Sequence, residues 1–169
     1  MDQNQRDGLF ETLTELVKDY EFLLLDLGAG ISDTVLSLAR MAQMRVVLVT
    51  PEPTSLTDGY AVIKVLHAKH GVRNFCVVVN QASADEARET FQRLNMACKN
   101  FLGFELVNLG HIRMDANVTS AVRHQTPLAK HAPQCPAYKD IAAIAGRIAH
   151  YRRENIEAVA GRTPLKDFS

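Results

Sequence analysis

The sequence predicts an α/β fold in which a parallel sheet is flanked by helices. Four apolar runs of strand length alternate with segments of helical periodicity, and this alternation favours right-handed crossovers between parallel strands. Each run closes on a polar residue or a polar loop, as expected where a buried strand reaches the edge of a sheet. The four runs are residues 22–26, 45–50, 75–79 and 104–110.

Helical patterns occupy the stretches between these runs. Apolar residues recur at helical spacing over residues 5–19, and Ser32 with Asp33 supplies caps for a helix over about residues 34–42. A capping-box-like start at Ser55 predicts a helix that ends at Gly71. The remaining predicted helices are an amphipathic one at 84–101, a short one with Val118, Ala121 and Val122 that Pro127 stops, and a final one at 138–151 with Ile141, Ile144 and Ile148 facing inward.

The composition is that of one globular domain and excludes several classes of protein. The 169 residues carry 19 basic and 19 acidic side chains, and this zero net charge argues against a general nucleic-acid-binding protein. Three widely spaced cysteines without a C-x-x-C pair indicate neither a disulfide framework nor a cysteine zinc site. No signal peptide and no apolar run of membrane-spanning length is visible, which predicts a cytoplasmic location.

The stretch around Asp26 is the strongest candidate for a functional site. Asp26 ends the first apolar run, and Gly28 and Gly30 follow it, so a carboxylate stands beside backbone that can approach a ligand closely. Ligands of open parallel sheets bind beyond the carboxyl ends of the strands. A carboxylate and free amide groups are what a magnesium–phosphate site needs. The alternative is that Asp26 merely caps the following helix.

Three further loops are expected at the same edge of the sheet. They begin at Thr50, at Asn80 and at His111, and the last of them ends at Asp115. Because four polar loops would then meet at one edge, the pattern favours a nucleotide or phosphate site over a capping role for Asp26.

Five blocks of the sequence resemble the MinD/ParA group of deviant P-loop ATPases, and within it the flagellar-number regulators FlhG and FleN. The motif P-E-P-T-S-x-T-D, followed by Tyr-Ala-x-Ile-Lys, is typical of MinD-like proteins, while F-L-G and A-V-x-x-Q favour the flagellar branch. The resemblance covers roughly residues 6–150. It implies a partial P-loop NTPase fold of the SIMIBI, MinD-like class, with a truncated ATPase domain at 1–151 and a polar, frayed tail at 152–169. The blocks are Leu25–Ile31, Thr50–Lys64, Val77–Asn80, Phe101–Gly103 and Ala121–Pro127.

The resemblance implies a role for each candidate residue. Asp26 matches the switch-II aspartate, which in the family helps to place the magnesium ion, through a water, and the attacking water, so ATP and Mg²⁺ are the implied cofactors. Gly28 and Gly30 would give the switch its mobility, Asn80 would contact the adenine ring, and the loop ending at Asp115 would close over the base. That loop lacks the family's usual proline and reads Ile112-Arg113-Met114-Asp115, a departure that bears on the Asp115 contact.

The 169 residues lack the phosphate-binding motif of this family. Neither G-x-x-x-x-G-K-[ST] nor K-G-G-x-G-K-T occurs, so the backbone cradle and its lysines are missing. We therefore expect no useful ATP hydrolysis by this chain alone. A sheet without its central strands should have an unpaired edge and an uncovered apolar face, so we expect self-association or dependence on a partner.

The resemblance implies a MinD-like regulator of flagellar number, a nucleotide-switch protein here without its P-loop. Its implied partners are a flagellar transcriptional activator or the flagellar placement GTPase, together with a nucleotide-dependent homodimer. Two alternatives stay open: a non-enzymatic interaction module derived from this family, and a MinD/ParA-type positioning or partitioning protein. The partitioning alternative has less support, because no basic carboxyl-terminal helix for DNA is visible.

Membrane association is common among MinD relatives, through an amphipathic terminal helix. Gly161 and Pro164 interrupt any continuous apolar face after Arg152 in this chain. The expected location is therefore the cytoplasm, with a polar or peripheral position at the inner membrane as the alternative that the family implies.

Overall fold

The computed structural model of the chain describes residues 20–154. The helix expected at residues 5–19 and most of the expected tail lie outside this part. Within it the elements run α2 (Asp33–Met41), β1 (Arg45–Val49), α3 (Pro53–His70), β2 (Phe75–Asn80), α4 (Ala84–Leu102), β3 (Val107–Ile112), α5 (Ala116–Arg123), α6 (Leu128–His131) and α7 (Pro136–Glu154).

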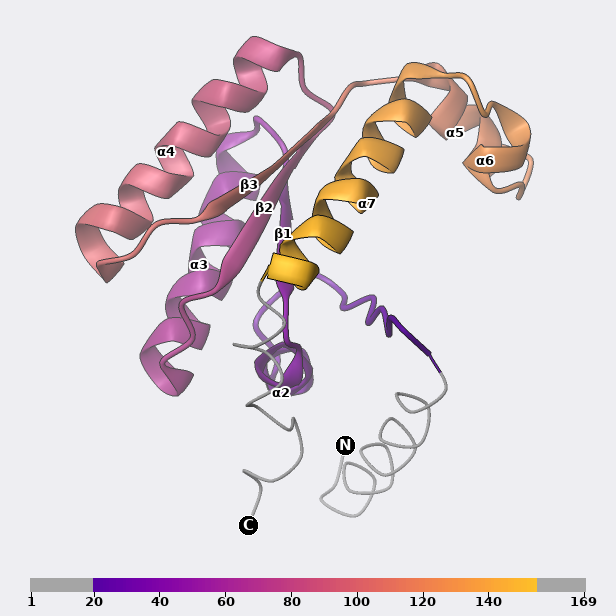
Figure 1. Ribbon diagram of the computed structural model, residues 1–169. Helices are drawn as coiled ribbons and strands as arrows, with labels where there is room; N and C mark the ends of the chain where they lie inside the picture. The colour runs from indigo at the N-terminus through magenta and orange to yellow at the C-terminus, as the bar shows by residue number, and fades with distance from the viewer. Residues whose placement is uncertain (1–19, 155–169) are drawn as a thin grey trace.

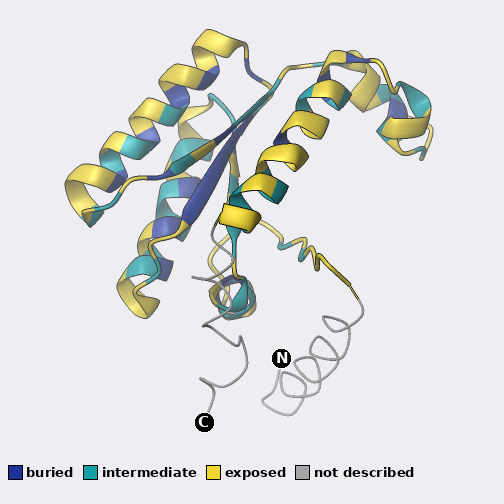
Figure 2. Cartoon of the chain, viewed as in Figure 1, coloured by how far each residue is buried: buried dark blue, intermediate teal, exposed yellow. Residues whose placement is uncertain are grey.

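The described strands form one parallel sheet in the order β1-β2-β3, as the alternating pattern predicts. Helices α3 and α4 lie on one face, α7 crosses the other, and α5 with α6 projects beyond the carboxyl ends of the strands (Figure 1). The central strand, β2, is buried along nearly its whole length (Figure 2). The result is a three-layer α/β/α arrangement.

Alternate residues of β2 enter two separate hydrophobic clusters. Phe75, Val77 and Val79 belong to a large cluster with α2, α3 and α4. Cys76 and Val78 belong to a smaller one with α7. This period of two explains why the strand reads as a continuous apolar run, since both of its faces are covered.

Residues 22–26, which the sequence predicts as the first strand, do not form a strand in the structure. They form no β-ladder with any of the described strands, and Phe22 and Leu24 are 50% and 92% exposed. An apolar run becomes a buried strand only where a neighbouring strand offers its amide and carbonyl groups. The described sheet offers none at this segment. Its first residue, Phe22, and the preceding Glu21 instead contact the end of α7: Arg152 forms an ion pair of 2.8 Å with Glu21, and its guanidinium lies over the Phe22 ring.

The start of α3 also differs from the prediction. The helix begins at Pro53, whose ring pre-sets a helical φ, and the N-cap residue Glu52 forms no side-chain cap. The Ser55 hydroxyl is not a cap either, because it accepts a hydrogen bond from the backbone amide of Thr50 at 2.9 Å. The predicted end at Gly71 is confirmed, with the glycine in the left-handed region at φ 66°.

The capping and the ends of the later elements also differ from the prediction. The capping box falls on α4, where Ser83 and Glu86 cap each other's backbone amides. The last strand begins three residues later than predicted, at Val107, and α7 continues to Glu154, so residues 152–154 are helical. Ile144 is buried as predicted, whereas Ile141 is 41% exposed because the first turns of α7 extend beyond the sheet (Figure 1).

Two helical glycines form a matched test of packing. A Cβ on Gly59 of α3 would lie 2.7 Å from Cγ1 of the buried Val49, whereas a Cβ on Gly146 of α7 would meet open space. We expect Gly59→Ala to lower the free energy of unfolding by about 0.5–2 kcal/mol despite its better helix propensity. Gly146→Ala should raise it by about 0.5–1 kcal/mol. Urea denaturation measures the free energy of unfolding of both variants. An equal change in this free energy in the two variants would contradict the close contact between α3 and β1.

Candidate functional site at the carboxyl edge of the sheet

Three of the four predicted loops meet at the carboxyl edge of the sheet. β1 ends at Val49, β2 at Asn80 and β3 at Ile112, and all three strands point the same way. The exits of β2 and β3 are joined directly, since the Ala82 amide donates to the Ile112 carbonyl at 3.2 Å. The fourth loop, after Asp26, is not held at this edge, because its strand is not part of the described sheet.

Asn80 lies at the centre of this edge. It is half-buried, and its Oδ1 accepts the backbone amide of Gln81 at 3.0 Å. Gln81 adopts a left-handed conformation with φ 56°, which is uncommon for a residue other than glycine. The Asn80 side-chain amino group has no hydrogen-bond partner among residues 20–154, so two donors remain for an external group.

Thr50 provides a second unused group. Its Oγ1 is buried and is the one buried side-chain oxygen or nitrogen in the described part of the chain without a hydrogen-bond partner. Buried hydroxyls normally have a hydrogen-bond partner, and because the Thr50 hydroxyl has none among the described residues, it can bond to a ligand or to a bound water. Sequence reasoning missed it, because a threonine at the end of a β-branched run gives no special signal.

Asp115 holds two helices together. Its Oδ1 accepts the backbone amide and the side-chain amide of Asn117 at 2.9 and 2.8 Å, which caps α5. Its Oδ2 accepts the Ala137 amide, at the start of α7, at 3.1 Å. The hydrogen bonds from the Asn117 and Ala137 amides lower the pKa of Asp115 to about 2. The carboxylate therefore acts as a structural cap, and its contact with a nucleotide stays a prediction.

The same loop is clamped by an ion pair that sequence reasoning missed. Arg113 donates from its Nε and Nη2 to the two carboxylate oxygens of Asp140 on α7, at 2.8 and 2.7 Å, and its backbone amide donates to the same carboxylate at 3.0 Å. These hydrogen bonds lower the pKa of Asp140. Arg113 thus fixes the β3–α5 loop, which lacks the family's usual proline, to α7.

The two roles of Asp115 predict a particular pH dependence. The pKa of its carboxyl is depressed in the folded chain, so its contribution to stability is complete above the ordinary pKa near 3.8 and is lost as the pH falls toward 2. Asp115→Asn keeps one acceptor for Asn117 but presents an amino group to Ala137. We expect thermal melting to show a lower midpoint for this variant at pH 6 and a difference that shrinks toward pH 2.

A matched control is Asp58→Asn, on an exposed position of α3. It should leave the wild-type pH dependence in place. A difference between Asp115→Asn and wild type that is constant from pH 6 to pH 2 would contradict the double-cap assignment.

Asp26 and its glycines lie apart from this edge. Asp26 is exposed, and the alternative that it caps the next helix is excluded, since Ser32 is the N-cap of α2 and its hydroxyl accepts the Val35 amide. Gly30 has φ 107°, a conformation that favours glycine, and it lines a shallow hollow of about 310 Å³ against Asp58, Ala61 and Val62 of α3. In Figure 1 the segment from Tyr20 to Gly30 runs below the strands, away from α5.

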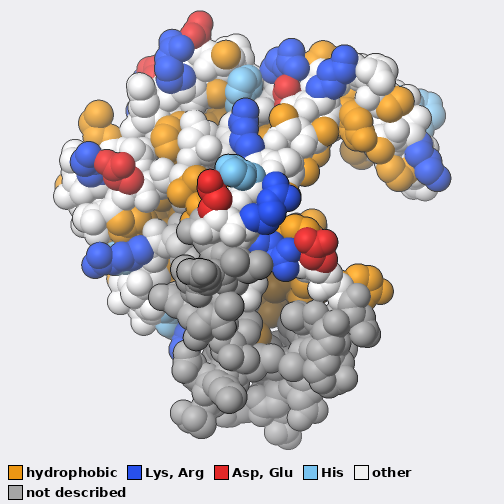
Figure 3. Space-filling view, in the orientation of Figure 1, with side chains coloured by type: hydrophobic (Ala, Val, Ile, Leu, Met, Phe, Trp, Pro, Cys, Tyr) orange, Lys and Arg blue, Asp and Glu red, His pale blue; other side chains and the backbone are white. Residues whose placement is uncertain are grey.

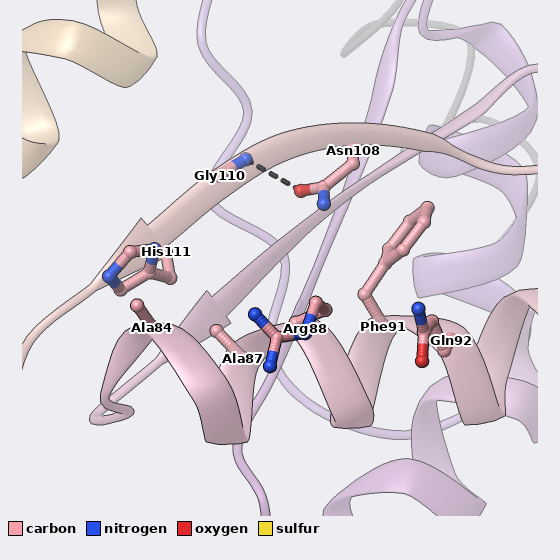
Figure 4. Close-up of a pocket in the computed structure, with 8 residues that line it drawn as sticks. All are labelled: Ala84, Ala87, Arg88, Phe91, Gln92, Asn108, Gly110 and His111. Atoms are coloured by element: carbon pink, nitrogen blue, oxygen red, sulfur yellow. Dashed lines mark hydrogen bonds between the residues drawn. The ribbon is translucent and has the colours of Figure 1, made fainter.

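A second hollow lies between α4 and β3 (Figure 4). Its volume is about 320 Å³, and the polar side chains that line it are Arg88, Gln92, Asn108 and His111. Arg88 is already paired with Asp85 at 2.7 Å, and Asn108 accepts the Gly110 amide at 2.8 Å. Two of its four polar side chains are therefore committed to neighbours within the fold.

At the edge of the sheet, Asn80 offers a group for the base side of a magnesium–ATP site but not for its phosphates. The unpaired amino group of Asn80 suits a purine edge, but residues 20–154 contain no glycine-rich loop with a lysine that could hold phosphates. No group of three or more His, Cys, Asp and Glu side chains in this part of the chain could hold a metal ion. The phosphate-binding loop of the site is thus not supplied by these residues.

Comparison with known proteins gives the family. The family model described as cellulose biosynthesis protein BcsQ matches residues 2–148. The chain is 35% identical over 145 residues to antiactivator FleN of Pseudomonas aeruginosa, covering 85% of this chain and 52% of FleN. It is 31% identical over 132 residues to flagellum site-determining protein YlxH of Helicobacter pylori, covering 78% of this chain and 45% of YlxH.

The fold is similar to that of a solved structure, the MinD cell division protein of Aquifex aeolicus. The TM-score is 0.66 at 22% identity, over 83% of this chain and 58% of MinD. The chain spans about half the length of the curated flagellar relatives that it matches. None of the helices within residues 20–154 combines the length and apolar character needed to cross a membrane. With the family model over most of its length, two flagellar relatives and a MinD-like partial P-loop NTPase fold, the chain belongs to the BcsQ family of the MinD/ParA group, in its FlhG/FleN branch.

Proposed function

We propose that this chain acts in the control of flagellar number, as part of a nucleotide switch of the FlhG/FleN type. The observation that carries the proposal is the 35% identity with antiactivator FleN over 85% of the chain. The name of YlxH, a flagellum site-determining protein, supports the same process. A flagellar transcriptional activator or the placement GTPase is the proposed partner, and the proposed location is the cytoplasm or the inner face of a membrane.

Each candidate residue has a proposed role in that switch. Asn80, with its free amino group at the sheet edge, would contact the base, and the loop ending at Asp115 would close beside it. Asp26 would orient a magnesium-bound water, and Gly28 and Gly30 would let its segment move. Open space around both glycines supports that mobility.

A second function is favoured by the missing phosphate motif. The 169 residues contain no P-loop, so this chain by itself would act as an interaction module without turnover. A partitioning role has less support, because Lys and Arg side chains are interspersed with carboxylates on the face drawn in Figure 3 and form no broad basic surface there. The two favoured functions differ in whether nucleotide is needed.

Flagella counting in Pseudomonas aeruginosa tests the proposal. A chimera in which the P-loop portion of FleN precedes this chain would replace FleN, and flagella per cell would be counted by electron microscopy. We expect the chimera to restore the normal number. If the 169-residue chain alone restores it, the interaction module is the correct function, and if neither does, the flagellar proposal is wrong.

A further inference from the structure

The hollow between α4 and β3 is lined by groups that donate hydrogen bonds. Arg88 and Gln92 line it from α4, and Asn108 and His111 line it from β3 (Figure 4). Within the described part of the chain, the side chains of Gln92 and His111 form no hydrogen bond, and Asn108 uses only its oxygen, which accepts the Gly110 amide. No Asp or Glu is among the described residues that line the hollow. The groups left unused therefore include more donors than acceptors, which suits an anionic ligand.

One wall of the hollow is apolar. The Phe91 ring points from α4 toward β3, and Ala84 and Ala87 line the hollow nearer to the start of the helix (Figure 4). An exposed face or edge of an aromatic ring attracts a second ring in an offset or edge-to-face arrangement. The volume of about 320 Å³ is that of a site for a small ligand. The hollow can thus take a small molecule with an anionic end and a flat apolar part.

The edge of β3 beside the hollow is not open to an added strand. β3 carries a bulge near Leu109, and the Leu109 carbonyl accepts a hydrogen bond of 2.7 Å from Arg147. The Gly110 amide donates to the Asn108 side chain at 2.8 Å. Bulges and satisfied backbone groups are the usual means of preventing strand addition. A small molecule therefore fits this edge better than an extended peptide does.

Arg88 determines which charge the ligand should carry. It is the one permanent cation among the described residues that line the hollow, so a monoanion balances it, whereas a phosphate monoester brings up to about two negative charges. Its ion pair with Asp85 uses only Nη2, at 2.7 Å, and the two side chains are 66% and 84% exposed. Because such an exposed pair contributes little, a ligand carboxylate can replace Asp85 and bind two nitrogens of the guanidinium.

We propose that this hollow binds a small aromatic carboxylate, with its two oxygens on Arg88 and Asn108 and its ring against Phe91. The site is separate from the edge that carries Asn80, because Asn80 belongs to the alternate residues of β2 that face α7, whereas the hollow lies against α4 on the opposite face of the sheet (Figure 1). The proposal goes beyond the flagellar proposal and does not depend on it.

Titration of the full 169-residue chain with benzoate, followed by ¹H–¹⁵N NMR, tests the proposal. We expect saturable shifts of the side-chain amide signals of Gln92 and Asn108, with a Kd of about 1 mM or tighter. Benzamide has the same shape without the charge, and we expect it to bind at least about tenfold more weakly. Phenyl phosphate should bind no more tightly than benzoate does.

Substitutions on α4 test the role of Arg88. Arg88→Gln should raise the Kd for benzoate at least about tenfold, and Asp85→Asn, which releases the guanidinium, should lower it by about two- to fivefold. Arg93→Gln is the matched control, because Arg93 also lies on α4, is 64% exposed against 66% for Arg88, and pairs with Glu89 outside the hollow. It should leave the Kd within about twofold of the wild-type value.

Circular dichroism checks that each variant is folded, which we expect because the replaced side chains are exposed. A wild-type chain without saturable shifts at Gln92 and Asn108 would overturn the proposal, as would equal weakening by Arg88→Gln and Arg93→Gln. Benzamide binding as tight as that of benzoate would show that the hollow requires no anion, and tighter binding of phenyl phosphate would contradict the choice of a carboxylate.

Discussion

Replacing Gly110 with alanine is expected to lower the free energy of unfolding by about 2–4 kcal/mol. Gly110 has φ 118°, a backbone conformation that alanine adopts only under strain. Its missing Cβ would lie 2.2 Å from Nη1 of Arg147, the atom that donates to the Leu109 carbonyl. Arg147 would have to swing away, and the bulge carbonyl would then lose its donor. Urea denaturation measures the loss.

A double-mutant cycle separates the two causes. Arg147→Ala removes the same hydrogen bond without changing the β3 backbone. If the contact is as described, Gly110→Ala should cost at least about 1 kcal/mol less in the Arg147→Ala background than in the wild type. Additive effects would mean that backbone strain alone accounts for Gly110, and that α7 is not anchored through this contact.

Asp26→Ala should abolish ATP turnover in the chimera that carries the P-loop portion of FleN. A carboxylate that positions a magnesium-bound water contributes to the transition state, so we expect turnover to fall at least about a hundredfold. The wild-type chimera should bind ATP only with magnesium present. Phosphate release measures the rate.

The control for this substitution is Asp33→Asn, in the first turn of α2. It alters a carboxylate seven residues further along the chain but should leave turnover within about twofold of the wild-type chimera, as a surface change of small effect does. Unchanged turnover in Asp26→Ala would contradict the assignment of Asp26 as the switch aspartate.

Much of the fold could be predicted from local patterns. The apolar runs gave β1, β2 and β3, and alternation with helices gave their parallel direction. The run at 22–26 has the same character but no partner strand among the described elements, and a strand exists only in a ladder. Helix α6 was missed because four residues are too few to show a period.

The position of a candidate residue could be predicted where that residue ends a strand. Asn80 lies at the edge where the pattern places it. The double cap by Asp115 and the clamp between Arg113 and Asp140 were not predictable, since they join residues 22 and 27 positions apart and no local spacing marks them. They arise only once α7 has folded back over the sheet.

Titration calorimetry with magnesium–ATP tests the central claim most directly. The claim is that these residues supply the base side of a MinD-type switch without its phosphate cradle. We predict no heat beyond dilution for the 169-residue chain, and saturable, magnesium-dependent binding for the chimera. Tight binding with ATP turnover by the 169-residue chain itself would contradict the account, because its phosphate site would then be built from other residues.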